Sequence, residues 1–223
     1  MSGRRGGEAP DPAGPGAALI REILGEAGIE APAGVVDRLA VHAAEMLRWN
    51  RSIRLTAITD PVEVAVKHIA DSLALLRFAP FPGRMLDFGS GAGYPGIPLA
   101  LYLPGTRVVL LEASEKKCAF LSRVRGMLGL ENVRVVHGRA SKRETLPIGR
   151  FDDIVTRATA PSSEVVPLLS PYLAEGGRML FMAGPGGGSA PAAPGTVTRV
   201  ERFRLPRGMG EREIAEVVLP EKE

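Results

Sequence analysis

The sequence predicts an α/β fold: a mostly parallel sheet with helices on both faces, an antiparallel strand pair at its C-terminal end and an N-terminal helical cap. Three observations indicate this fold. From residue 84 onward, short apolar runs alternate with amphipathic helical patterns, which places successive strands in parallel. Residues 17–80 show helical patterns alone, and residues 196–219 show two strand patterns around a Pro/Gly turn. We expect 17–80 to form the cap and 81–223 to form one compact core.

The first part of the chain predicts a tail followed by three helices. Residues 1–16 are rich in Gly and Pro and cannot bury enough surface to offset their ordering entropy, so we expect them to be disordered. Apolar residues recur at helical spacing over 17–27, 35–50 and 62–78. Asp60, followed by a proline, is typical of a helix N-cap and predicts where the third helix begins.

The segment 49–60 is too polar at alternate positions for a core helix and predicts a loop. It carries the only Trp of the chain together with Arg51, Arg54 and Thr56. Such a loop suits contact with a substrate, but it also suits a linker in which Trp49 fills a gap in the core. The residues alone leave both interpretations open.

The core is expected to contain five strands joined by helices. The predicted strands are 84–88, 107–111, 132–136, 151–156 and 178–182, and the predicted helices are 97–103, 115–128 and 164–174. A Glu-Gly-Gly turn at 175–177 should introduce the fifth strand, and residues 184–195 predict a mobile loop because they are almost entirely Gly, Pro, Ala and Ser.

Two further strands, 196–205 and 211–219, complete the sheet. Arginines gather on this pair at 199, 202, 204 and 207. They either protect the sheet edge from pairing with other chains or contact nucleic acid.

Composition excludes several classes of protein. The 223 residues carry a formal net charge of +3, which permits an acidic partner without requiring one. The single Cys118 excludes an internal disulfide and a cysteine-rich zinc site, and the three histidines lie far apart, so we predict no metal. No apolar run approaches the ~18 residues of a membrane span. We expect a soluble, cytoplasmic monomer with no membrane partner.

A ligand site is predicted directly after the first strand. Asp87 is followed by Gly89, Gly91, Gly93 and Gly96, and glycines this dense permit a tight turn that approaches a ligand closely. The helix that starts after this turn points its free N–H groups at the ligand. Ligands in such folds bind at the carboxyl ends of the strands.

Two ligand classes fit this turn. Residues 91–96 match the dinucleotide pattern G-x-G-x-x-G, and Glu112 lies at the spacing of an acid that binds ribose hydroxyls. The order D-x-G-x-G-x-G, which begins at Asp87, instead resembles the first motif of the class I, Rossmann-like S-adenosylmethionine-dependent methyltransferases. An acid before the glycines suits a sulfonium and ammonium cation better than a pyrophosphate, so we favour the methyl donor.

Longer segments resemble one methyltransferase family. They are Trp49-Asn50 with Leu55-Thr56-Ala57, the run from Lys67 to Leu73, the run from Asp87 to Ala100, Lys116-Lys117 with Phe120-Leu121, the run from Leu130 to Val133 with Gly138-Arg139-Ala140, and Arg157-Ala158. The chain resembles the glucose-inhibited-division protein B family, the ribosomal RNA small subunit methyltransferase G enzymes that methylate guanine N7 in 16S ribosomal RNA.

The resemblance implies roles for individual residues. The S-adenosylmethionine site would use Asp87, Gly89, Gly91, Gly93, Tyr94, Glu112, Ala140, Ser141 and Arg157. Arg51, Arg54, Thr56, Lys67 and His68 would contact the RNA of the small ribosomal subunit. His68 and Asp71 share a helix face, and packing explains them as well as chemistry does. Guanine N7 carries no proton, so the transfer needs no general base, and no catalytic residue is assigned.

The chain departs from the family pattern at three positions. Arg54 stands where the family has Asn, Ser141 where it has an acid, and Ala183 where it has Lys. Serine accepts a hydrogen bond from the adenine amino group more weakly than a carboxylate does, which predicts lower donor affinity. Alternatives are a methyltransferase for another nucleic acid, a protein or a small molecule, and a non-catalytic RNA-binding relative.

Overall fold

The computed structural model describes residues 14–32, 34–141, 145–157, 164–184 and 195–220. Most of the predicted N-terminal tail, most of the predicted loop 184–195, and Ala158 lie outside these ranges. Among the described residues, no helix is long and apolar enough to cross a membrane.

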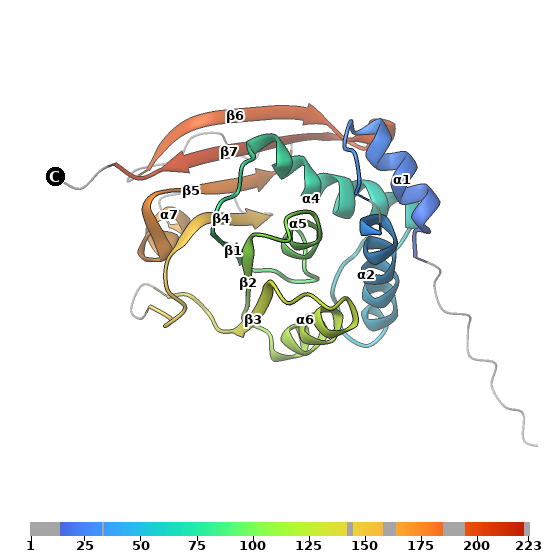
Figure 1. Cartoon of the computed structure of the whole chain (residues 1–223), viewed down its shortest axis with the longest axis horizontal. Coiled ribbons are helices and arrows are strands. Elements are labelled where there is room, and N and C mark those ends of the chain that lie inside the picture. Colours follow the sequence, from blue (N-terminus) through green and yellow to red (C-terminus); the bar gives the residue numbers. More distant parts are fainter. Residues whose placement is uncertain (1–13, 33, 142–144, 158–163, 185–194, 221–223) are drawn as a thin grey trace, which may run out of the picture.

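Seven strands form one sheet in the order β3-β2-β1-β4-β5-β7-β6 (Figure 1). The first five strands are parallel, whereas β7 runs antiparallel to β5 and β6 runs antiparallel to β7. This arrangement confirms the predicted fold class and the C-terminal strand pair. The strands are β1 Arg84–Phe88, β2 Arg107–Glu112, β3 Val133–His137, β4 Phe151–Arg157, β5 Leu173–Ala183, β6 Thr196–Arg204 and β7 Glu211–Val218.

Helices cover both faces of the sheet, as predicted. The larger hydrophobic cluster contains side chains of α1, α2, α5 and α6, and a second cluster contains those of α7. The α-helices are α1 Ala17–Glu26, α2 Val35–Asn50, α3 Pro61–Val64, α4 Asp71–Leu73, α5 Gly96–Tyr102, α6 Glu115–Met127 and α7 Val165–Leu169. A π-helical segment spans Ala65–Ala70, and 3-10 turns span Ala74–Phe78, Ser170–Tyr172 and Pro206–Gly208.

The third predicted helix is present but irregular. Asp60 caps it as expected, because its Oδ1 accepts a hydrogen bond from the Glu63 N–H at 2.9 Å. Its middle, Ala65–Ala70, is π-helical rather than α-helical. Such wide turns are frequent at functional sites, and this one carries Lys67 and His68.

The predicted helix 164–174 is wrong at its C-terminal end. The α-helix stops at Leu169, and Pro171 cannot donate a hydrogen bond that would extend it. The chain then enters β5 at Leu173, which pairs with Phe151. The register shifts before Arg178 pairs with Asp153, so the predicted Glu-Gly-Gly turn interrupts the strand instead of preceding it.

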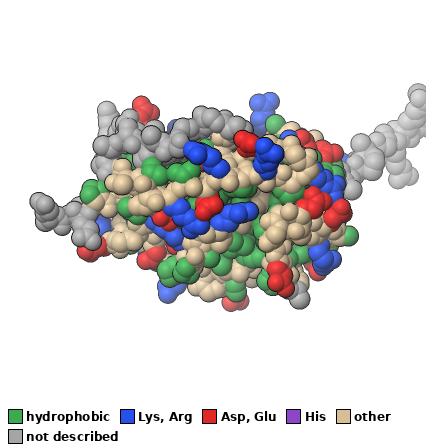
Figure 2. All heavy atoms as spheres, turned by 90° about the horizontal axis from the view of Figure 1, so that it is seen from above, with side chains coloured by type: hydrophobic (Ala, Val, Ile, Leu, Met, Phe, Trp, Pro, Cys, Tyr) green, Lys and Arg blue, Asp and Glu red, His purple; other side chains and the backbone are tan. Residues whose placement is uncertain are grey.

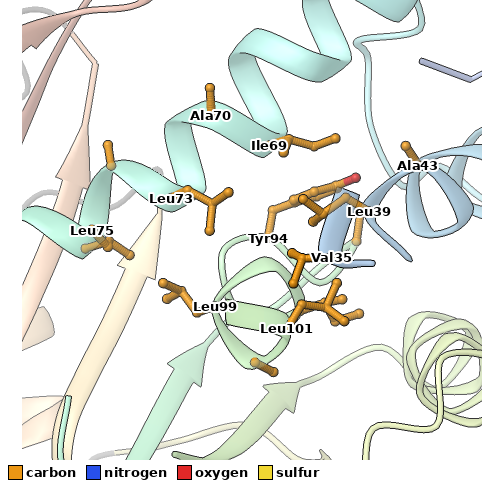
Figure 3. Close-up of a cluster of buried hydrophobic side chains, with 14 of the residues drawn as sticks. Val35, Leu39, Ala43, Ile69, Ala70, Leu73, Leu75, Tyr94, Leu99 and Leu101 are labelled. Atoms are coloured by element: carbon orange, nitrogen blue, oxygen red, sulfur yellow. The ribbon is translucent and has the colours of Figure 1, made fainter. Parts of the chain in front are cut away.

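Tyr94 lies at the centre of the larger cluster (Figure 3). Its ring lies between two helical segments: α2, which contributes Leu39 and Ala43, and the π-helical segment, which contributes Ile69. Leu99 of α5 lies below the ring in this view. One apolar cluster therefore contains residues of the predicted cap and of the predicted core. The division of the chain into a cap and a core unit stays a prediction.

Candidate functional site

A glycine turn follows β1 at the carboxyl edge of the sheet. Gly89, Gly91 and Gly93 have φ of 76°, 55° and 85°, which side-chain-bearing residues rarely adopt. The N–H groups of Gly89 and Ser90 both donate to the Leu111 carbonyl, at 2.9 and 3.1 Å, and fix the turn to β2. A Cβ atom at Gly93 would collide with Ile97, whereas a Cβ atom at Gly89 would meet nothing within 4 Å. The open side of the turn is therefore at Gly89.

Asp87 is buried beneath the turn, with 1% of its surface exposed. Its Oδ2 accepts a hydrogen bond from the Gly96 N–H at 3.0 Å, while Oδ1 has no hydrogen-bond partner among the described residues. Burial raises the pKa of this carboxyl to about 7, against the opposing effects of the Gly96 N–H, Ser90 and Arg157. A cation beside Oδ1 would stabilise the ionised form.

Glu112 ends β2 and fixes the other side of the turn. Its Oε2 accepts from the Gly91 N–H at 2.9 Å and its Oε1 accepts from the Ser114 N–H at 2.8 Å. Each carboxylate oxygen can accept more than one hydrogen bond. The carboxylate is therefore held in place by the backbone and can still bind a pair of hydroxyl groups.

The remaining predicted donor residues lie after β3 and at the end of β4. The Gly138 N–H donates to the Glu112 carbonyl at 3.0 Å, which holds the segment after β3 against β2. In that segment Ala140 is buried and Ser141 is exposed. Arg157 is the last residue of β4, next to Thr156, which pairs with Phe88 of β1. The topology thus brings the predicted donor residues to one edge of the sheet, namely Asp87, the glycine turn, Glu112, Ala140, Ser141 and Arg157.

Tyr94 occupies the predicted turn, but its side chain points into the core. The ring stacks between His42 and His68, with centroid distances of 4.5 and 4.8 Å. His42 Nε2 lies 2.8 Å from the Ala92 carbonyl, so this nitrogen carries the proton and donates. Burial lowers the pKa of His42 to about 4, which keeps the ring neutral. Sequence reasoning missed His42, whose only signal is a polar residue on the apolar face of α2.

A chain of hydrogen bonds joins Arg157 to the segment after α2. Arg157 Nη1 lies 3.0 Å from His68 Nδ1 and, being protonated, must donate. His68 Nε2 therefore carries the ring proton and donates to Thr56 Oγ1 at 2.8 Å. Burial lowers the pKa of His68 to about 3, so this tautomer is neutral. Asn50 completes the chain, because its side chain accepts from the Thr56 N–H and donates to the Thr56 carbonyl, both at 3.0 Å.

A pocket of about 300 Å³ lies beside this chain of hydrogen bonds. It is lined by Ile58, Lys67, His68, Asp71, Arg157, Met182, Ala183, Gly184 and Arg212. The predicted RNA-contacting residues Lys67 and His68 thus meet the predicted donor residue Arg157. The other three do not line it: Arg51 and Arg54 are exposed on the loop, and Thr56 is bonded to His68.

The arginines of β6 and of the turn after it form ion pairs with acids. Arg202 binds Glu213 at 2.7 Å, Arg199 binds Glu201 at 2.8 Å and Arg204 binds Glu211 at 3.2 Å. Arg207 binds Glu22 and Glu26 of α1 at 2.5 and 3.1 Å. Figure 2, which looks onto this side, shows Lys and Arg interspersed with Asp and Glu. This pairing favours a protected sheet edge over a nucleic-acid surface.

The residues that the structure describes contain no group of three His, Cys, Asp or Glu side chains that could hold a metal ion. The fold, the glycine turn and a family match over residues 36–186 define a Rossmann-like S-adenosylmethionine-dependent methyltransferase. The fold is similar to that of a SAM-dependent methyltransferase from Aquifex aeolicus, with a TM-score of 0.53 and 16% identity over 72% of this chain and 94% of that one. The orphan oxygen of Asp87 and the open side of Gly89 fit this cofactor.

Residues 36–186 match the model of the family described as rRNA small subunit methyltransferase G, and the chain belongs to that family. Proteins named ribosomal RNA small subunit methyltransferase G are similar over most of their length. The protein from Geobacter sulfurreducens is 36% identical over 89% of this chain and 95% of its own. The protein from Anaeromyxobacter dehalogenans is 41% identical over 87% of this chain and 92% of its own.

Proposed function

We propose that this protein transfers a methyl group from S-adenosylmethionine to N7 of a guanine in 16S ribosomal RNA, and that it acts as a cytoplasmic monomer. The observation that carries the proposal is the position of Arg157 between the predicted donor site and the pocket. This residue ends β4 at the donor edge, lines the adjoining pocket, and is hydrogen-bonded to His68 of the predicted RNA-contacting segment. A donor and an acceptor bound on the two sides of Arg157 would be neighbours.

The donor would lie over the glycine turn. Asp87 would bind its ammonium group through Oδ1, which has no hydrogen-bond partner among the described residues, and Glu112 would accept hydrogen bonds from its ribose hydroxyls. Gly89 would let the ligand approach the backbone, because this side of the turn is open. Ala140 and Ser141 would contact the adenine, with Ser141 a weaker acceptor than a carboxylate.

The chemistry requires placement rather than proton transfer. S-adenosylmethionine supplies a methyl group on a sulfonium centre, and guanine N7 supplies an unshared electron pair. The protein's contribution is to align the two and to exclude other nucleophiles. Positive charge moves from the donor to the base during transfer, and the Asp87 and Asp71 carboxyls near the two ligands would stabilise that charge when ionised.

The RNA would be held by basic residues around the pocket. Lys67, Arg157 and Arg212 line it, and Arg51 and Arg54 lie on the adjoining loop. Sequence-specific recognition of RNA usually takes an unstacked base, which a pocket of this kind can accept. Affinity should fall with salt at a slope of about 0.7 per phosphate neutralised if the RNA is single-stranded.

The direct test incubates the purified chain with S-adenosylmethionine and 16S ribosomal RNA from cells that lack the gene, as naked RNA and as small-subunit particles. We expect one N7-methylguanosine per RNA by mass spectrometry, and none with Gly89→Val. Methylation of another base or another molecule would replace the substrate in this proposal. RNA binding without any transfer would instead favour the non-catalytic relative.

A further inference from the structure

Asp71 is the charged residue of the pocket to which no substrate contact has been assigned. It is 4% exposed and lies at the start of α4, directly after the π-helical segment. Its Oδ1 is buried and forms an ion pair with Arg212, whose Nε lies 3.3 Å away, but this contact does not have the geometry of a full hydrogen bond among the described residues. Buried carboxylate oxygens normally accept hydrogen bonds. Because Asp71 lines the pocket and a carboxylate can accept several hydrogen bonds, it can accept further ones from a ligand there.

The pocket has two walls of different origin. Arg157 and Ala183 come from the carboxyl ends of β4 and β5, beside the donor edge, whereas Lys67, His68 and Asp71 come from the helical segment that crosses this edge. Its volume of about 300 Å³ is at the lower end for ligand sites, which suits a single base.

Guanine offers different atoms to these two walls. N7 lies on the Hoogsteen edge of the ring system, whereas N1–H and the 2-amino group, which are both hydrogen-bond donors, lie on the Watson–Crick edge next to it. If N7 faces the donor edge, the Watson–Crick edge is turned to the side of the methyl group and can face the helical wall.

We propose that Asp71 selects guanine by accepting hydrogen bonds from N1–H and the 2-amino group. This inference rests on the proposed function and adds a specificity-determining residue to it. Adenine would be rejected, because its N1 is an acceptor facing the carboxylate and it has no 2-amino group. The cost of leaving such buried polar groups unpaired is what makes hydrogen-bonded sites selective.

Arg212 supports this role of Asp71. Burial raises the pKa of the Asp71 carboxyl, and the charges of Arg212 and Arg157 oppose that rise. Arg212 lies on β7, outside the residues 36–186 that match the family model. The C-terminal strand pair would thus take part in base recognition by holding the carboxylate.

The test replaces the methylated guanine by inosine, which keeps N7 and N1–H and lacks only the 2-amino group. For the unmodified protein we expect kcat/KM to fall by about 10- to 100-fold, the value of a hydrogen bond to a charged acceptor. In Asp71→Asn, kcat/KM for guanine should fall by a similar factor, and the further penalty for inosine should shrink to about threefold or less. Donor affinity should stay unchanged in this variant.

Asp153→Asn is the matched control. Asp153 is also buried and paired with an arginine, Arg178 at 2.7 Å, but it lies toward the opposite edge of the sheet, where β1 begins. This variant should keep the full inosine penalty.

Equal methylation of guanine and inosine by the unmodified protein would overturn the role of Asp71, even if Asp71→Asn fails to fold. An inosine penalty that is the same in Asp71→Asn as in the unmodified protein would overturn it too. Both outcomes leave the proposed function standing, because guanine is still methylated at N7. Absence of any N7 methylation by the unmodified protein would instead refute the proposed function and this inference with it.

Discussion

Gly89 is the residue at which the donor site is most easily destroyed without damage to the core. Its φ of 76° strains any other residue, but a side chain there would meet no protein atom within 4 Å. We expect Gly89→Val to abolish S-adenosylmethionine binding in calorimetry, because the valine would occupy the ligand's place.

Gly129 provides the control for this substitution. It has a φ of 57° and equally open surroundings, but it follows α6 and lies away from the glycine turn. Gly129→Val should carry a similar backbone strain and keep donor affinity. Equal loss of binding in both variants would mean that strain, not obstruction, explains the effect.

Asp87 predicts a pH dependence of donor binding. Because burial raises its pKa to about 7, the free protein holds a proton there at lower pH, and a cationic ligand must displace it. Affinity should rise by up to about tenfold per pH unit from pH 5 to 7 and then level off. Calorimetry at several pH values measures this slope, which Asp87→Asn should remove. A pH-independent affinity of the unmodified protein would argue against contact with the ammonium group.

The same shift has the opposite sign for stability without ligand. The folded state holds the Asp87 proton more tightly than the unfolded chain, whose carboxyl has an ordinary pKa of 3.8. Its contribution to stability is therefore largest at low pH and declines as pH rises from about 4 to about 7. Burial of Asp87 thus lowers the stability of the ligand-free protein at neutral pH, and a cation bound beside its carboxylate would offset this loss.

The predicted donor residues could be proposed from the sequence because the motif is local, and their contacts with the donor stay a prediction. Asp87 and the glycines follow one strand, and Glu112 ends the next. The stack of His42, Tyr94 and His68 was missed because it joins residues from three separate segments. The backbone of Tyr94 lies in the predicted turn while its side chain points into the core, so a contact with the donor stays a prediction.

At the scale of elements, the loop after α2 is the segment that we expect to contact RNA. Arg54 is exposed on it, while Thr56 is fixed by Asn50 and His68. Arg54→Ala should weaken RNA binding, lower the salt slope by about 0.7 to 1, and leave donor affinity unchanged. Filter binding at several salt concentrations measures both quantities.

Arg125→Ala is the control for the loop, because Arg125 is exposed in the last turn of α6, away from the carboxyl edge of the sheet. It should leave the salt slope unchanged. If both variants lower the slope equally, the loop has no special role and RNA is attracted by the overall charge.

Elements were predictable where one pattern dominated. The bounds of β1 are those predicted, because an apolar run ends at a glycine turn. The helix before β5 was overextended, since apolar residues at 165–173 fit a helix and a buried strand equally well. Pro171 ends the helix locally, but the start of β5 at Leu173 depends on its pairing with Phe151, which is a property of the sheet.

At the scale of the whole molecule, the pocket depends on contacts that no local pattern contains. Arg212 of β7 meets Asp71 of α4 because β7 pairs with β5 and so reaches the helical segment over the sheet edge. The order of strands beyond β5 determines this contact. The fold class was therefore predictable from the sequence, whereas the composition of the substrate pocket required the topology.

The most direct test of the central claim compares 16S ribosomal RNA from cells with and without this gene. N7-methylguanosine is located by strand cleavage directed at that base and counted by mass spectrometry. We predict one guanine that is methylated when the gene is present, unmethylated when it is deleted, and restored by the unmodified gene but not by Gly89→Val. Identical small-subunit patterns in the two strains, with the protein shown to be expressed, would contradict the account.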